Sequence, residues 1–328
     1  MSIIEETLKR TNLKKTPVWM MRQAGRHLPE YRKIREAFPS LLEMFLNSEV
    51  VAEVTLQPTR RYNIDAAIIF SDILMVPHTL QAKINFNKET QSPTVEIDFK
   101  ATQKIENANP VFEAIKIVKS RSNIPLIGFS GGPWTTIYYC LFNTENRKKN
   151  IEEKIKQAER QIDKLVDKFT VATIEYVLKQ IDSGINIFQL FESWSGLLND
   201  DQFEKWCIQP AVEIFREVKN KNIPTIGFPR GASKQNYVLY SNIKNLNCVS
   251  LDHNFNLNHT KELNQNIAYQ GNLNPLVLMN GGEALSNEIE KILLAFDKLP
   301  HIFNLGHGIL PNTPTRNVEQ MITQIKSK

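Results

Sequence analysis

Short apolar runs that stop abruptly recur along this chain, and they constrain its fold more than any other feature. Glycine or a polar residue follows within two residues of the end of each run. The runs are Ala66–Phe70, Pro125–Phe129, Asn186–Phe191, Ile223–Phe228, Cys248–Leu251, Ile267–Tyr269 and His301–Leu305. Runs of this kind are typical of strands buried on both faces of a parallel sheet. Pro17–Met21 is a candidate for an additional strand.

Helical patterns lie between these runs. Ile151–Ile181 carries apolar residues with a 3.6-residue period, and Asp201–Asn220, Gly282–Lys298 and Thr315–Lys326 read the same way. We expect Asn199 or Asp200 to cap one of these helices, and Thr313 or Thr315 to cap another. Strand then helix, repeated along the chain, predicts a parallel α/β fold.

Two parallel architectures fit this pattern. A doubly wound open sheet concentrates its ligand contacts near one switch point. Here polar residues follow almost every strand, which favours a barrel whose site collects all the strand ends. We therefore predict an α/β fold: a single (β/α)8 TIM-type barrel domain over residues 1–328. Ala82–Asn87 and Thr94–Phe99 predict a β-hairpin inserted after the first clear strand.

Composition excludes several function classes. The 40 basic and 35 acidic side chains give a formal net charge of +5, without a basic stripe, so nucleic acid is a poor partner. Three separated cysteines without a CxxC favour a reducing, cytoplasmic setting. We expect neither a signal peptide nor a membrane span. No GxGxxG or GxxxxGK[ST] motif indicates a dinucleotide or nucleoside triphosphate.

The segment from Arg22 through Gln23, Ala24 and Gly25 to Arg26 predicts a pocket for a ligand with several negative groups. Arginine presents a fork of donors that matches a carboxylate or phosphate. A helical turn would place Arg22 and Arg26 on one face. Gly25 lacks a side chain, so backbone N–H groups could approach a ligand closely. The alternative is an entry helix with solvated arginines.

Four further residues come after predicted strands. Asp72 is either a helix cap or a pocket carboxylate, and Ser193 in such a position is usually a cap. His307 lies between two glycines, where backbone can come close to a ligand. Tyr139 belongs to a helix that begins near Pro133, and such a helix N-terminus attracts anions unless it is only a tight turn.

Taken in order, these segments resemble the uroporphyrinogen decarboxylase family from Pro17 to Pro311. The quoted motifs are the arginine segment, Ser-Asp-Ile-Leu-Met-Val-Pro, Gly-Phe-Ser-Gly-Gly-Pro-Trp, Gln-Leu-Phe-Glu-Ser-Trp-Ser-Gly, Gln-Gly-Asn-Leu-Asn-Pro and Asn-Leu-Gly-His-Gly-Ile-Leu-Pro. The resemblance implies a homodimer without cofactor or metal. It implies catalytic roles for Asp72 and Arg22, and substrate binding by Arg22, Gln23, Ala24, Gly25, Arg26, Asp72, Tyr139, Ser193 and His307.

The implied reaction removes CO2 from the four acetates of uroporphyrinogen III and gives coproporphyrinogen III. Protonation of a pyrrole supplies the electron sink, and the Asp72 carboxylate would accept the pyrrole N–H groups and stabilise the cation. Arg22, His307, Tyr139 and a pocket water all remain candidate proton donors. The chain departs from the family pattern at His27, His253 and Asn274, where tyrosine, tryptophan and aspartate are usual.

Two alternatives remain open. Cobamide-linked methyltransferases resemble this family and use a His-x-Cys pair to hold zinc. In this chain Tyr138, Lys205 and Leu246 stand two residues before the cysteines, so that reading is weak. The second alternative is a non-catalytic tetrapyrrole-binding protein.

Tyr138 could also be confused with Tyr139, although we expect Tyr138 to lie in the core or at the surface.

Overall fold

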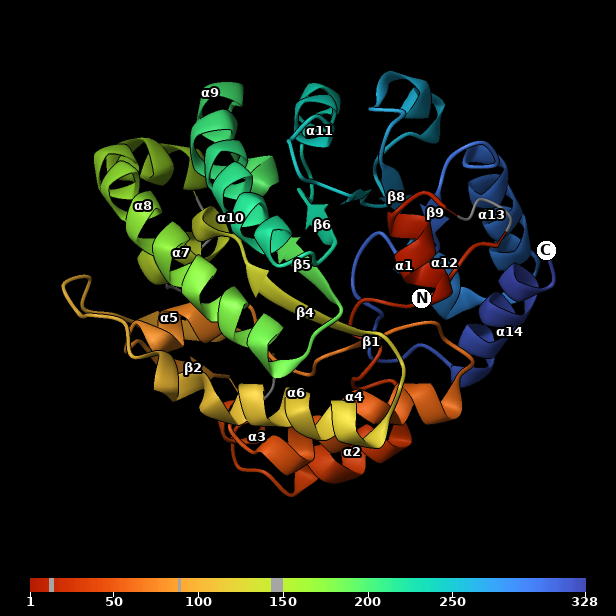
Figure 1. The fold of residues 1–328 in the computed structure, drawn as a ribbon, viewed down its shortest axis with the longest axis horizontal. Helices are drawn as coiled ribbons and strands as arrows, with labels where there is room; N and C mark the ends of the chain where they lie inside the picture. The colour runs from red at the N-terminus through yellow and green to blue at the C-terminus, as the bar shows by residue number, and fades with distance from the viewer. Residues whose placement is uncertain (12–14, 88–89, 143–149) are drawn as a thin grey trace.

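Seven parallel strands curl into a barrel in the computed structural model, which describes residues 1–11, 15–87, 90–142 and 150–328 (Figure 1). The strands pair in chain order, and they are β1 (Ala67–Ile68), β4 (Leu126–Gly131), β5 (Ile187–Phe191), β6 (Thr225–Phe228), β7 (Cys248–Ser250), β8 (Ala268–Gln270) and β9 (His301–Ile302). Each lies within or beside a run that the sequence predicted. The TIM-type barrel is confirmed.

The N-terminal segment completes the ring between the last strand and the first. Val18 forms a parallel bridge with Phe303, and the Asp65 N–H donates to the Val18 carbonyl at 2.9 Å. The strand expected over Pro17–Met21 is therefore reduced to one bridge. The pairing stops there because the next N–H groups, of Met20 and Met21, donate to side-chain oxygens instead.

Helices cover the outside of the barrel (Figure 1). The longer ones are α4 (Ser48–Arg61), α6 (Asn109–Arg121), α7 (Pro133–Leu141), α8 (Ile151–Ser183), α10 (Gln209–Asn220), α13 (Gly282–Ala295) and α14 (Thr315–Lys326). The shorter ones are α1 (Ile3–Leu8), α2 (Pro29–Glu36), α3 (Leu41–Phe45), α5 (Met75–Thr79), α9 (Asp200–Phe203), α11 (Lys234–Ser241) and α12 (Pro275–Asn280). Single turns form η1 (Ile105–Ala108), η2 (Ser195–Leu197) and η4 (Leu257–Glu262), and η3 (Glu204–Ile208) is a π-helical turn.

The predicted helix ends are partly right. Asn199 caps α9, because its side chain accepts from the Gln202 N–H and its own backbone N–H donates to the Gln202 side chain. The expected cap at Thr313 or Thr315 is wrong, since Pro314 occupies the cap position of α14 and offers no side-chain acceptor. The predicted helix over Asp201–Asn220 contains the π-helical turn η3, which the periodicity did not reveal.

The predicted hairpin is confirmed. Strands β2 (Lys83–Phe86) and β3 (Pro93–Glu96) pair antiparallel, with Ile84 opposite Val95. The second strand begins earlier and ends earlier than the expected Thr94–Phe99. The side chains of Ile84 and Val95 are both buried, so this face of the hairpin packs against the rest of the molecule.

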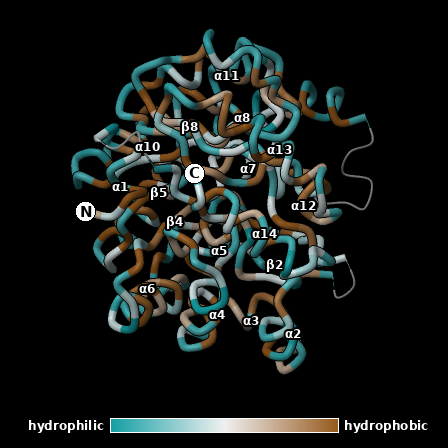
Figure 2. The backbone as a smooth tube through the Cα atoms, turned by 90° about the vertical axis from the view of Figure 1, so that its right-hand side faces the viewer, coloured by the Kyte–Doolittle hydropathy of each residue, from teal (hydrophilic) through white to brown (hydrophobic). Residues whose placement is uncertain are grey.

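The inside of the barrel contains a polar network among buried apolar side chains. Figure 2 shows hydrophilic and hydrophobic stretches alternating along the backbone. The indole N–H of Trp19 donates to Gln270, whose amide nitrogen donates to both Gln189 and Ser250. All four side chains are buried. Two glutamines of the quoted motifs therefore tie opposite strands together. Within the described residues, no helix is long and apolar enough to cross a membrane.

Candidate active site

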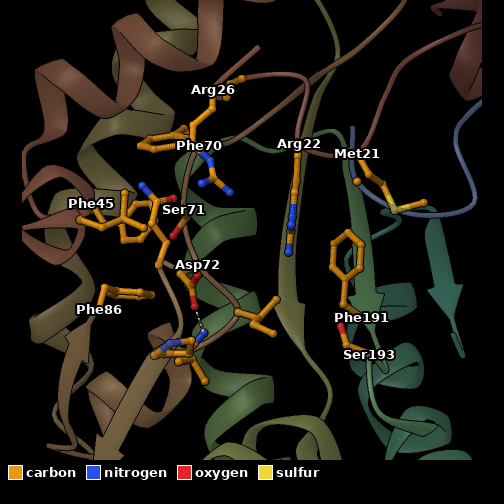
Figure 3. Close-up of a pocket in the computed structure, with 18 of the residues that line it drawn as sticks. Met21, Arg22, Arg26, Phe45, Phe70, Ser71, Asp72, Phe86, Phe191 and Ser193 are labelled. Carbon is orange, nitrogen blue, oxygen red and sulfur yellow. Dashed lines mark hydrogen bonds between the residues drawn. The ribbon is translucent and has the colours of Figure 1, made fainter. Parts of the chain in front are cut away.

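A cavity of about 1090 Å³ opens where the strands end. Eight of the nine predicted site residues line it: Arg22, Ala24, Gly25, Arg26, Asp72, Tyr139, Ser193 and His307. In Figure 3, Arg22 extends between Asp72 on one side and Phe191 and Ser193 on the other. Parallel strands share one end of a barrel, which explains why residues far apart in sequence meet here.

The arginine segment forms turns rather than the helical turn that would have placed Arg22 and Arg26 on one face. Arg22 has φ of 62°, in the left-handed region, so it cannot continue a right-handed helix. The Gln23 N–H bonds to the Met20 carbonyl, and the Ile309 N–H bonds to the Met21 carbonyl. Helix α2 begins only at Pro29. Arg22 and Arg26 nevertheless both reach the cavity, and neither forms an ion pair within the part of the chain described.

Glycines on two segments make room for the arginine turn. A β-carbon at Gly308 would overlap the side chain of Arg22, approaching its Cγ at 2.7 Å. A β-carbon at Gly25 would lie 2.9 Å from the Arg22 carbonyl oxygen. Gly25 thus permits the tight turn in addition to lining the cavity, and Gly308 leaves the space that the Arg22 side chain occupies.

Gln23 is the predicted site residue that lies outside the cavity lining. Its side chain is buried, accepts from the Met20 N–H at 3.0 Å and donates to the Ala66 carbonyl at 3.0 Å. It joins the arginine turn to the residue before β1. Gln23 therefore holds this turn against the barrel.

Asp72 presents a carboxylate at the end of β1. Its Oδ1 accepts from the Leu74 N–H at 2.9 Å, as an Asx-type cap would, while the residue also lines the cavity. The two readings of Asp72 are thus compatible. Burial raises the pKa of Asp72, whereas the Leu74 N–H and the charge of Arg22 act in the opposite direction.

Tyr139, Ser193 and His307 complete the predicted set on the cavity wall. Tyr138, next to Tyr139, is fully buried and stacks on Trp194, so it belongs to the core as expected. Burial, with smaller effects from Arg22 and Arg230, lowers the pKa of His307 to about 4. His307 is therefore an uncharged imidazole at neutral pH.

The N-terminus of α7, for which the sequence left open an anion site or a tight turn, holds a side chain of the protein. The carboxyl of Glu192 occupies that position, where its Oε2 accepts from the Thr135 hydroxyl at 3.0 Å. A β-carbon at Gly132 would collide with this carboxyl. Burial raises the pKa of Glu192 to about 8. The helix end is thus filled by a carboxyl of the protein itself, from the residue after β5, and its raised pKa favours the protonated, uncharged form at neutral pH.

Arg230 is a lining residue that the sequence analysis did not select. It follows β6, and its guanidinium carbon lies 5.9 Å from the centre of the Trp194 ring. The signal that could have found it was the one used for Asp72, Ser193 and His307: a polar residue directly after a buried strand.

Comparisons with known proteins identify the family. A family model described as "Uroporphyrinogen decarboxylase (URO-D)" matches residues 2–327. The chain belongs to the uroporphyrinogen decarboxylase family. It is similar to proteins of that name from Chelativorans sp. (strain BNC1), 39% identical over 94% of both chains, and from Orientia tsutsugamushi (strain Ikeda), 40% identical over 100% of this chain and 98% of the other.

A solved structure of a methyltransferase from Methanosarcina mazei superimposes with a TM-score of 0.80. It covers 99% of this chain and 97% of the other, at 17% identity. At that level of identity the likeness concerns the fold alone.

The three departures from the family pattern have identifiable surroundings. Asn274 caps α12, since its side chain accepts from the Leu276 N–H as an aspartate would. The His253 ring lies 3.3 Å from the Gly306 carbonyl, one residue before His307. His27 is buried and stacks parallel to Tyr62.

The cysteines of this family member do not resemble zinc ligands. Cys140, Cys207 and Cys248 are all buried, and burial raises the pKa of each thiol above its ordinary value. A metal-binding cysteine is a thiolate. Within the described ranges, no group of three or more His, Cys, Asp or Glu side chains could hold a metal ion.

Proposed function

We propose that this chain decarboxylates the four acetate side chains of uroporphyrinogen III to give coproporphyrinogen III in haem biosynthesis. The observation that carries the proposal is a single carboxylate, Asp72, in a large cavity that Arg22 and Arg26 also line. A volume of about 1090 Å³ is large for a small-molecule site and suits a macrocycle. The names of the relatives at 39% and 40% identity point the same way.

In this proposal Asp72 binds the centre of the substrate. The Leu74 N–H holds Oδ1, so Oδ2 is the oxygen left for the inward pyrrole N–H donors. These donors and Arg22 favour the ionised form of Asp72 and oppose the effect of burial. Arg22 and Arg26 would bind peripheral carboxylates through their forked donors.

Each decarboxylation then uses the substrate as its own electron sink. A proton adds to the pyrrole carbon beside an acetate and leaves a cationic ring. The C–C bond to the carboxylate breaks, CO2 departs, and its electron pair neutralises the ring. A second proton at the resulting exocyclic carbon gives the methyl group, and loss of the ring proton restores the pyrrole. Asp72 stabilises the cation, an electrostatic contribution of a few kcal/mol.

The electrostatics of the cavity reduce the set of candidate proton donors. His307 is uncharged at neutral pH because burial lowers its pKa to about 4. It would therefore orient the substrate or relay a proton rather than store one. We propose that a pocket water, Tyr139 or Arg22 delivers the proton.

The test is incubation of the purified protein with uroporphyrinogen III under anaerobic, cofactor-free conditions, followed by chromatography of the oxidised porphyrins. We expect porphyrins with seven, six, five and finally four carboxylates. Binding without any product would favour the non-catalytic tetrapyrrole-binding protein. Neither binding nor turnover would refute the proposal.

Three further properties belong to the same proposal. We propose a single domain, a homodimer, which the family resemblance implies, and a cytoplasmic location, which unpaired cysteines favour. Sedimentation equilibrium would test the oligomeric state, and a monomer at micromolar concentration would contradict the dimer.

A further inference from the structure

Arg230 lies in the cavity wall without an anionic partner. It follows β6, is half-buried, and forms no ion pair in the described ranges. Trp194 lies beside its guanidinium, at 5.9 Å from ring centre to Cζ. A half-buried arginine is ordinarily paired or solvated. This one shares the cavity with Arg22 and Arg26.

The backbone around Arg230 is held from two sides. Its carbonyl accepts from the Ser195 hydroxyl at 3.0 Å and from the Gly196 N–H at 3.3 Å. On the other side the Asp252 Oδ2 accepts from the Gly231 N–H at 2.6 Å. These contacts fix where the arginine side chain begins, as a preorganised binding residue requires.

Asp252 supports this turn rather than neutralising Arg230. Its Oδ2 also accepts from the Tyr237 hydroxyl at 2.8 Å, and its Oδ1 accepts from the Asn254 N–H at 2.7 Å. Three donors thus occupy the carboxylate, and no ion pair joins it to the guanidinium of Arg230. The fork of Arg230 remains available to a carboxylate that enters the cavity.

We propose that Arg230 binds a peripheral carboxylate of the tetrapyrrole substrate on the side of the cavity formed by Trp194 and Ser193, and that Asp252 and Tyr237 position it. The inference rests on the proposed function. A substrate with eight carboxylates needs more cationic partners than Arg22 and Arg26 supply, and Arg230 adds a third around the cavity. Burial lowers the pKa of Arg230, and the nearby charge of Asp252 opposes that shift without forming an ion pair with the guanidinium.

The test compares Arg230→Gln with wild type in anaerobic decarboxylation of uroporphyrinogen III. Loss of a charge-assisted contact should raise KM roughly ten- to a hundredfold. The kcat should change little, because a peripheral carboxylate is held equally in the ground and transition states. Arg230→Lys keeps the charge but loses the fork, so its KM should lie between the two.

The matched control is Arg216→Gln, on the outer helix α10, where the arginine is exposed and contacts Glu217. It should retain the wild-type KM. Tyr237→Phe removes the hydroxyl that donates to the Asp252 carboxylate and accepts from the Asp252 N–H, and it should raise KM less than Arg230→Gln does. If Arg230→Gln fails to fold, Arg230→Lys decides the question.

An unchanged KM in Arg230→Gln or, where that variant does not fold, in Arg230→Lys would overturn the inference. So would a lowered melting temperature with reduced kcat and normal KM, because that result identifies a purely structural arginine. Failure of the wild type to turn over uroporphyrinogen would instead refute the proposed function. The two failures are therefore distinguishable.

Discussion

Replacing Asp72 by asparagine tests the mechanism most directly. The Leu74 N–H selects an oxygen at the Oδ1 position, so the amide nitrogen of the variant must take the place of Oδ2. An N–H2 group would then face the pyrrole N–H donors. The acceptor and the charge that stabilises the cationic ring are both lost.

The expected loss follows from this geometry. Removing one preorganised group that faces the developing charge costs about 2.7–4 kcal/mol, or roughly 10²- to 10³-fold in kcat. The assay is anaerobic turnover of uroporphyrinogen III, with Asp297→Asn as the control. Asp297 is an exposed aspartate outside the cavity lining. Near-normal turnover by Asp72→Asn would refute the proposed role of the carboxylate.

Stability should change in the opposite sense to activity. Burial raises the pKa of Asp72 in the folded state above its value in the unfolded state. The folded wild type therefore loses stability as the pH rises through these two pKa values and the Asp72 carboxyl ionises. Asparagine keeps the bond to Leu74 without that charge. The variant should therefore melt at or above the wild-type temperature at neutral pH, and this advantage should shrink in acid. A lower melting temperature at neutral pH would mean that the lost activity reflects damage to the fold.

Three further outcomes are expected. Arg26→Lys should lower kcat/KM about ten- to a hundredfold through loss of the fork, measured beside a partly decarboxylated substrate that should suffer less; equal losses would argue for a solvated arginine. Gly308→Ala should displace Arg22 and lower kcat/KM about tenfold or more with the melting temperature retained; normal kinetics would show that Arg22 tolerates the shift. Dialysis against a strong chelator should leave activity unchanged, and activity restored only by added metal would reopen the methyltransferase-like alternative.

A fourth outcome concerns acid. Burial lowers the pKa of His27 from 6.5 to about 4, so the folded state binds fewer protons than the unfolded state between these values. The free energy of unfolding should fall by roughly 2 kcal/mol from neutral pH to about pH 5 on account of His27. His27→Phe should remove that part of the loss in urea titrations at the two pH values. The same dependence in both proteins would contradict this assignment.

The periodicity of the sequence by itself determined the alternation of strands and helices. Thr315–Lys326 forms the predicted helix, and the helix predicted from Ile151 begins there. The positions of Asp72, Ser193 and His307 followed from the same pattern. In a parallel barrel all strands end on one side, so a residue's place after its own strand suffices to bring it to the site.

Only the tertiary structure decided which partner each buried polar group contacts. Gln23 lies in the signature segment but bonds to the Ala66 carbonyl, and Glu192 fills the helix end that the sequence left for a ligand. Arg230 lines the cavity, and the Asp252 carboxylate accepts from the Gly231 N–H and the Tyr237 hydroxyl instead of pairing with it. Each outcome depends on contacts between segments far apart in the chain. Hydropathy and spacing describe the neighbours along the chain, whereas the partner of a buried polar group is set by what the closed barrel places against it.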